Sequence, residues 1–248
     1  MSETENYVGI TNKLPSGCIC YPEVDKTIPD SIKIRTLKGK DEKLIAEISA
    51  NNFDVKFIQI LKNVMMGVVC EKLTLGDRMY LALWQTINSY SKDFTVEYEC
   101  EYCWKKATYV VDLSTLDNIE LPKDFKEPYQ VKLPKSGTTL NLRLLRANDL
   151  IKVDELVKAN QNVWLYRYAL SIVNDKSVWD NLDLLENMDV ADIAVIRGFH
   201  DKFNHGPKME TGYKCPHCGG TGVMPVPFRL EMLLPYGEEL QRHIKDSI

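Results

Sequence analysis

The stretch FTVEYECEYCWKKATYVV (residues 94–111) decides the fold of this chain. Apolar and polar residues alternate through FTVEYE (94–99), which predicts a β-strand, and ATYVVDL (107–113) continues as a second strand. Cys100 and Cys103 lie between them, and a tight C-x-x-C turn points both sulfur atoms toward one metal ion. The sequence therefore predicts a strand, a metal-binding knuckle and a returning strand.

A second C-x-x-C pair occurs in GYKCPHCGGTGVMPVPF (212–228), and 111 residues separate it from the first pair. Gly219 and Gly220 permit a positive φ just past its sulfurs. Zn²⁺ prefers four tetrahedral ligands, and four thiolates leave no coordination position open to water. We therefore expect one structural Zn²⁺ per chain, in a zinc ribbon whose ligands are Cys100, Cys103, Cys215 and Cys218.

Other interpretations of the cysteines stay open at this point. The four thiols could fill a core as small hydrophobic groups, or one pair could be a redox motif. His217 could replace a cysteine as ligand, although a knuckle points its intervening residues away from the metal. Cys18 and Cys20 alternate on an extended segment and are assigned no role, and Cys70 is expected in the core.

The rest of the chain is mostly helical in pattern. Apolar spacing near 3.6 residues predicts five helices and a sixth that begins after a Thr74 N-cap with Asp77 three residues on. These helices are expected at 41–51, 54–69, 77–90, 149–160, 163–174 and 190–203, the last with Asp189 as its cap. Strands are expected at 31–37, in a hairpin over 129–145, and through Val226 to Met232.

These elements predict an α+β protein with a zinc-ribbon and β-hairpin centre, an N-terminal helical layer and a helical insertion between the two knuckles. We expect five parts: an extended, proline-punctuated N-terminal arm, a strand with the helical layer, the first knuckle with the hairpins, the helical insertion, and the second knuckle with the closing strand and tail. Their boundaries are 1–30, 31–92, 93–145, 146–206 and 207–248. Trp84 is expected to face the core and Trp104 to be exposed.

Composition limits the possible functions. The 248 residues carry 31 basic and 35 acidic side chains, and 44% are hydrophobic, which is typical of a globular protein. No apolar run is long enough for a transmembrane helix, and the acidic start MSETENYV is not expected to be a leader peptide. The first knuckle region, 91–112, has three basic and five acidic residues, which argues against phosphate binding.

The sequence contains no nucleotide-binding glycine loop, H-E-x-x-H or G-x-S-x-G motif, so no enzyme is expected. His200 and His205 lie five residues apart and are expected at a solvated helix end. No small-molecule substrate is expected.

The order of motifs along the chain resembles the baseplate protein family of T-even-type contractile phage tails, the small hub-associated baseplate protein. The resemblance spans about residues 8–236, and no single motif is diagnostic. It is carried by LPSGCICYP (14–22), LTLGDRMYLAL (73–83), VDLSTL (111–116), LPKDFKEPYQVKLPKSG (121–137), LRLL (142–145), KCPHCG (214–219) and VPFRLEMLLP (226–235), besides FTVEYEC.

The resemblance implies a non-catalytic structural or assembly protein of the baseplate hub, made in the host cytoplasm, located in the virion and bound to other baseplate and tail proteins. It also implies that the two cysteine pairs recur in the family. A cytoplasmic zinc-ribbon regulator of host polymerase or nucleic acid, and a transient hub-assembly chaperone absent from the virion, are the alternatives. An isolated chain can hardly bury the arm, which we expect against a neighbouring subunit or against its own strand 31–37.

Overall fold

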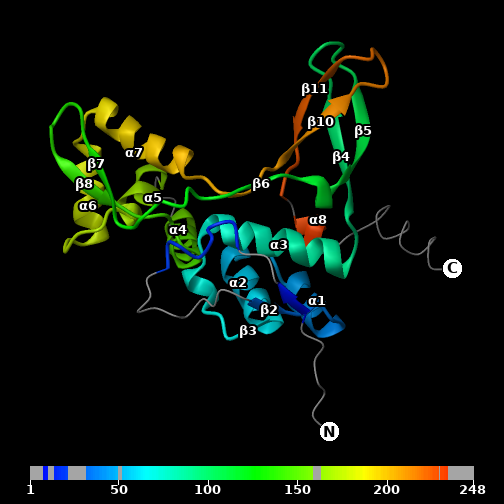
Figure 1. Cartoon of the computed structure of the whole chain (residues 1–248), viewed down its shortest axis with the longest axis horizontal. Helices are drawn as coiled ribbons and strands as arrows, with labels where there is room; N and C mark the ends of the chain where they lie inside the picture. Colours follow the sequence, from blue (N-terminus) through cyan, green and yellow to red (C-terminus); the bar gives the residue numbers. More distant parts are fainter. Residues whose placement is uncertain are drawn as a thin grey trace, which may run out of the picture.

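The computed structural model describes residues 8–10, 14–21, 32–49, 52–158, 163–228 and 230–233. Its elements form three groups around a central helix, α3 (Leu75–Ser89). A small helical layer lies below α3 in Figure 1, two long hairpins rise above one of its ends, and a helical lobe lies beyond the other. The chain is mixed helix and strand, as predicted, but the knuckle hairpins stand at one end of the molecule rather than at its centre.

The helical layer contains a three-stranded antiparallel sheet in the order β1-β2-β3. Its elements are β1 (Val8–Ile10), β2 (Ile32–Ile34), α1 (Gly39–Ala46), α2 (Phe53–Val64), β3 (Met65–Met66) and a short 3-10 helix, η2 (Cys70–Lys72). Apolar positions of α2 at helical spacing are buried together with one face of α3. Two predictions are confirmed here: Cys70 is fully buried, and Trp84 packs against this core.

The prediction of an extended, unburied N-terminal arm is wrong for residues 14–21, which form successive turns. Leu14 and Cys20 are buried, and Cys18 has a left-handed φ of 59°. Residues 8–10 pair antiparallel with β2, which confirms the alternative that the arm lies against its own strand. The rest of the arm lies outside the described residues.

A buried carboxylate explains why the turn at 14–21 folds back. The predicted N-cap of α3 is confirmed, because Thr74 Oγ1 accepts a hydrogen bond from the Asp77 N–H. The Asp77 carboxylate, instead of returning to the cap, accepts hydrogen bonds from Ser16 N and Oγ at 2.9 and 2.5 Å and from Tyr21 Oη at 2.6 Å. A fully buried carboxylate requires such donors, so it fixes the turn against α3.

The two knuckle hairpins pack face to face. They are β4 (Asp93–Glu99) with β5 (Lys106–Asp112), and β10 (Glu210–Lys214) with β11 (Thr221–Pro225). Both predicted strands of the first hairpin are confirmed, and their inward side chains share a core with Tyr213 and Met224. A 3-10 turn, η3 (Leu113–Thr115), follows β5.

The predicted strand from Val226 to Met232 is wrong, because strand β11 ends at Pro225. Val226 N donates to Met209 O at 2.9 Å, but Pro227 offers no N–H to a neighbouring strand. The chain then turns into a short helix, α8 (Leu230–Leu233), and the Phe228 ring packs edge-on against two phenylalanines of the helical layer.

The third group holds a short hairpin and four helices. Its elements are β7 (Tyr129–Lys132), β8 (Thr139–Leu142), α4 (Ala147–Lys158), α5 (Trp164–Ser171), α6 (Val178–Glu186) and α7 (Val190–Lys202). The hairpin and three of these helices were predicted; Asp189 is the N-cap residue of α7, although its side chain makes no cap hydrogen bond. Helix α6 was not predicted, although it begins with a Ser177/Asp180 capping box that the Ser-x-x-Asp pattern could have revealed. β6 (Asn118–Ile119) and β9 (Gly206–Pro207) pair where this group joins the rest.

Candidate functional site

The first knuckle is a tight turn closed by two backbone hydrogen bonds. Cys100 N donates to Lys105 O at 3.0 Å, and Trp104 N donates to Cys100 O at 2.8 Å. Trp104 has a φ of 59°, in the left-handed region that tryptophan rarely adopts. The turn places Cys100 and Cys103 on the same side.

The second knuckle repeats this pattern. Cys215 N donates to Gly220 O at 2.8 Å, and Gly219 N donates to Cys215 O at 2.9 Å. Gly219 occupies the position equivalent to Trp104 and has a φ of 74°. The expected positive φ is therefore observed at Gly219 but not at Gly220, and the same position of the first knuckle, Trp104, shares it.

The fold brings the four predicted cysteines together. Sγ of Cys100 lies 3.8 Å from Sγ of Cys218, and Sγ of Cys103 lies 3.7 Å from Sγ of Cys215. All four sulfurs lie within 4.8 Å of one another, and none forms a disulfide. Tetrahedral Zn²⁺ with bonds of about 2.3 Å would separate its sulfur ligands by about 3.8 Å, so the quartet fits a zinc ion.

The pKa values of two of the four thiols also favour a bound cation. Burial raises the pKa of Cys100, but backbone N–H groups that donate to its sulfur outweigh burial and bring the pKa to about 6. The Gly220 N–H lowers the pKa of Cys218, whereas burial and the three neighbouring thiols raise it to about 12. Without a metal, Cys100 and Cys218 therefore resist ionising together, and a divalent cation removes that conflict.

Aromatic residues cover the inner side of the quartet. Tyr213 Oη lies 3.9 Å from Cys100 Sγ, and the Tyr213 ring packs edge-on against Tyr98 and Tyr109. His217 is exposed, and its Nε2 lies 3.3 Å from Lys106 O, outside the cluster of candidate ligands. Cys18 and Cys20 are likewise outside it.

A second notable feature is the joint between α3 and the end of α7. A Cβ atom on Gly76 would lie 2.3 Å from His205 O, and one on Gly206 would lie 2.7 Å from Gly76 O, so two backbone segments touch directly. Buried His205 places Nε2 2.7 Å from Thr74 Oγ1 and Nδ1 3.0 Å from Phe203 O. This joint was not predicted; its signal in the sequence was a glycine between the predicted Thr74 N-cap and Asp77.

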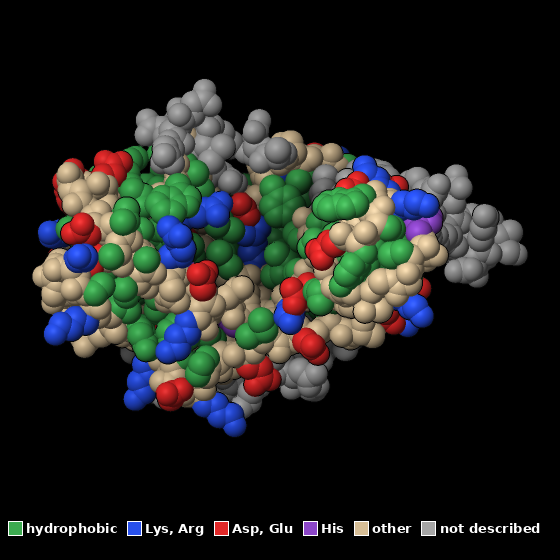
Figure 2. Space-filling model, turned by 90° about the horizontal axis from the view of Figure 1, so that it is seen from above, with side chains coloured by type: hydrophobic (Ala, Val, Ile, Leu, Met, Phe, Trp, Pro, Cys, Tyr) green, Lys and Arg blue, Asp and Glu red, His purple; other side chains and the backbone are tan. Residues whose placement is uncertain are grey.

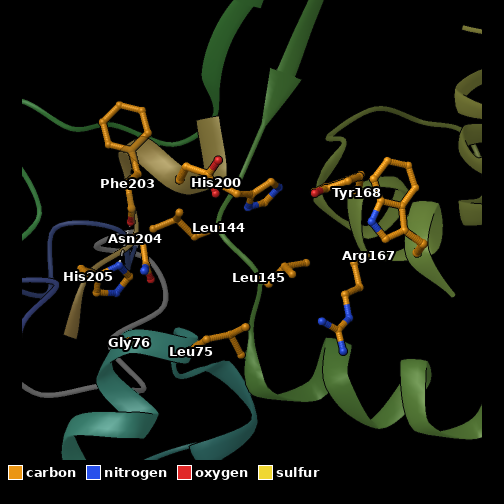
Figure 3. Close-up of a pocket in the computed structure, with 12 residues that line it drawn as sticks. Leu75, Gly76, Leu144, Leu145, Arg167, Tyr168, His200, Phe203, Asn204 and His205 are labelled. Carbon is orange, nitrogen blue, oxygen red and sulfur yellow. Dashed lines mark hydrogen bonds between the residues drawn. The ribbon is translucent and has the colours of Figure 1, made fainter. Parts of the chain in front are cut away.

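The joint borders a cavity of about 320 Å³ between α3, α5 and α7. The rings of His200 and Tyr168 pack against each other at its wall, with centroids 5.5 Å apart, and Figure 3 shows the two side chains directed toward each other. Arg167 and Leu145 also line the cavity. Burial lowers the pKa of His200 to about 4. The prediction that His200 and His205 lie at a solvated helix end is therefore wrong, because the insertion packs this end of α7 against the rest of the protein.

The cysteine quartet and the cavity next to the joint differ in the chemistry that their residues can support. The quartet can bind a metal and join two hairpins, whereas the cavity combines an arginine, a neutral imidazole and apolar walls without an assembled nucleophile and base. Within the described residues, no helix is both long and apolar enough to span a bilayer.

A comparison of the chain with models of protein families identifies a match. The family described as T4 bacteriophage base plate protein matches residues 13–232, a range that includes both knuckles, the joint and the helical lobe. No curated protein and no solved structure matches the chain.

Proposed function

Since the chain belongs to the T4 bacteriophage base plate protein family, we propose that it is a zinc-stapled, non-catalytic structural or assembly component of the hub region of a contractile-tail baseplate. Family membership supports the baseplate, a place in the virion tail and contacts with other tail proteins. The hub position and the contractile tail rest on the order of sequence motifs. The zinc staple rests on the sulfur geometry, which is the observation that carries the mechanism.

The staple would act on the fold rather than on a substrate. Cys100 and Cys103 from the β4–β5 hairpin and Cys215 and Cys218 from the β10–β11 hairpin would hold Zn²⁺. The ion would fix the relative position of two segments whose intervening chain forms the entire helical lobe. Metal binding to such a site adds directly to folding free energy.

The arrangement in space suits a connecting protein. The knuckle hairpins and the helical lobe project from different ends of α3 (Figure 1), so partners could bind at both ends of one rigid helix. The five parts expected from the sequence remain our proposal for its organisation, with the first knuckle and the helical insertion as separate projections, except that the hairpin at 129–145 packs with the helical insertion rather than with the first knuckle.

The metal is tested on purified full-length protein never exposed to chelator. We expect elemental analysis to give one zinc per chain, and Cys100→Ser to lower that value toward zero. The matched control is Cys70→Ser, since Cys70 is buried in the core of the helical layer and lies outside the quartet. Folded native protein without zinc would refute the staple.

The location is tested with washed phage particles. We expect quantitative mass spectrometry to find the chain in virions and a null mutant to produce no complete tails. If the null mutant lacks tails but the virions lack the chain, it is a transient assembly chaperone. If the chain stays in the lysate bound to host polymerase or nucleic acid and tails assemble without it, it is a regulator and the baseplate proposal fails.

A further inference from the structure

The tip of the first knuckle carries an exposed tryptophan on an unfavourable backbone. Trp104 is 73% exposed, which confirms the prediction for it, and its φ of 59° lies where side chains are disfavoured. Gly219, at the equivalent position of the second knuckle, shows that glycine suits this turn. Packing among the described residues does not explain the tryptophan, because most of its surface is open to water.

Tyr102, two residues earlier, is 64% exposed but held in place. Its hydroxyl donates to Thr221 O of the other hairpin at 3.1 Å, and its ring covers Gly220, where a Cβ would lie 2.7 Å from Cδ2 of the tyrosine. Hydrogen bonds across both knuckles fix the backbone beneath. The two aromatic rings are thus presented on a rigid support, which lowers the entropy that binding would cost.

We propose that the knuckle tip, defined as Tyr102, Trp104 and Lys105, inserts into an apolar pocket with an acidic rim on another protein of the baseplate. Exposed tryptophan and tyrosine are the side chains that most often supply binding energy at protein interfaces. A strained residue that the fold itself does not need indicates a function outside the fold. This inference rests on the proposed baseplate function.

Charge indicates the kind of partner. Lys105, Lys106 and Lys214 are exposed around the tip, which favours carboxylates at the rim of the partner pocket. Glu99 lies opposite Lys106 in the β4–β5 ladder, and Glu101 is also exposed on the tip, so the cationic excess is small. Nucleic acid would require a stronger positive surface. Figure 2 shows hydrophobic side chains on the end of the molecule that carries the knuckle hairpins, at the right of the view, with acidic and basic side chains beside them.

The first test separates folding from docking. We expect Trp104→Gly to keep its zinc content and a Tm no lower than that of the native protein, because glycine relieves the left-handed backbone, yet to lower infectious titre about 100-fold. Trp104→Phe, which keeps a ring on the same strained backbone, should restore most of the titre. The matched control is Trp179→Ala, which removes a 52% exposed tryptophan from α6 and should leave the titre unchanged.

The second test identifies the class of partner. A photoreactive benzoylphenylalanine at position 104, compared with one at position 179, is irradiated in infected cells. We expect a nuclease-resistant adduct with an identified baseplate protein from position 104 and no such adduct from position 179. A nuclease-sensitive adduct, or none, would overturn the inference.

The proposed function and the docking of the knuckle tip are refuted by different results. A null mutant that assembles normal tails refutes the proposed function. A null mutant without tails, together with normal titre for Trp104→Gly, refutes only the docking of the knuckle tip.

Discussion

Replacing Gly76 by alanine tests the joint on which the arrangement of the three groups depends. The added methyl would lie 2.3 Å from His205 O and 2.5 Å from Cδ2 of the same residue. Both atoms are held in place, since His205 is buried and the next residue, Gly206, also lies directly against the Gly76 backbone. The carbonyl must therefore retreat by roughly 1 Å to reach an ordinary contact distance.

The cost has three parts. Overpacking a rigid contact costs about 1–3 kcal/mol. Displacing His205 breaks its 2.7 Å hydrogen bond to Thr74 Oγ1, a loss of about 1 kcal/mol. Alanine recovers about 0.5–1 kcal/mol through helix propensity. The net expectation is a destabilisation of about 1–3.5 kcal/mol, or a Tm lower by about 2–14 °C for a chain of this size.

Gly198→Ala is the matched control. Gly198 lies within α7, and among the described residues no atom outside the backbone of that helix lies within 4 Å of the position its methyl would take. The same substitution should therefore raise stability by about 0.5–1 kcal/mol. Urea unfolding of zinc-loaded protein, followed by circular dichroism, measures both variants. If Gly76→Ala costs less than about 0.5 kcal/mol, or both variants shift in the same direction, the backbone contact is not tight and the reasoning is wrong.

Three further predictions concern other parts of the chain. Cys100→Ser should lose the cooperative unfolding transition whereas Cys70→Ser should cost about 1–2 kcal/mol, and comparable thermal shifts would contradict a metal staple. Burial lowers the pKa of His200 to about 4, so the free energy of unfolding should fall by up to about 3 kcal/mol as the pH drops from about 6.5 toward 4. His200→Gln should flatten that part of the curve of unfolding free energy against pH. An unchanged curve would exclude His200 as its source. Asp77→Asn should cost about 2–4 kcal/mol, since its donors at 14–21 lose a carboxylate, and exchange of the amide hydrogens at 14–21 should quicken; unaltered protection would show that the turn is held by something else.

Local sequence patterns predicted the structure correctly wherever the conformation of a segment depends only on its own residues. The alternation in 94–99 is a property of a strand with one buried face, and the Thr74 cap is completed within its own turn. The two C-x-x-C pairs likewise indicated a shared site, because their spacing sets the direction of each pair of sulfurs, and the structure brings them together.

The prediction of an extended arm failed because its evidence lay elsewhere in the chain. Proline and the lack of helical period correctly excluded a helix at 14–21. They could not show that Asp77, 61 residues away from Ser16, is buried and needs donors. The strand prediction beyond Pro225 failed similarly, because alternating apolar residues do not reveal that Phe228 packs against helices of another group.

The sequence by itself therefore determined the strands of the first hairpin, most helices and the four candidate ligands, since these depend on periodicity and short spacing. Only the tertiary structure decided the joint at Gly76, the partial burial of His200 and the burial of His205, and the strained backbone of Trp104, whose equivalent in the second knuckle is a glycine. Those features arise when distant segments exclude water and meet at atomic distance, and no property of either segment alone specifies that contact.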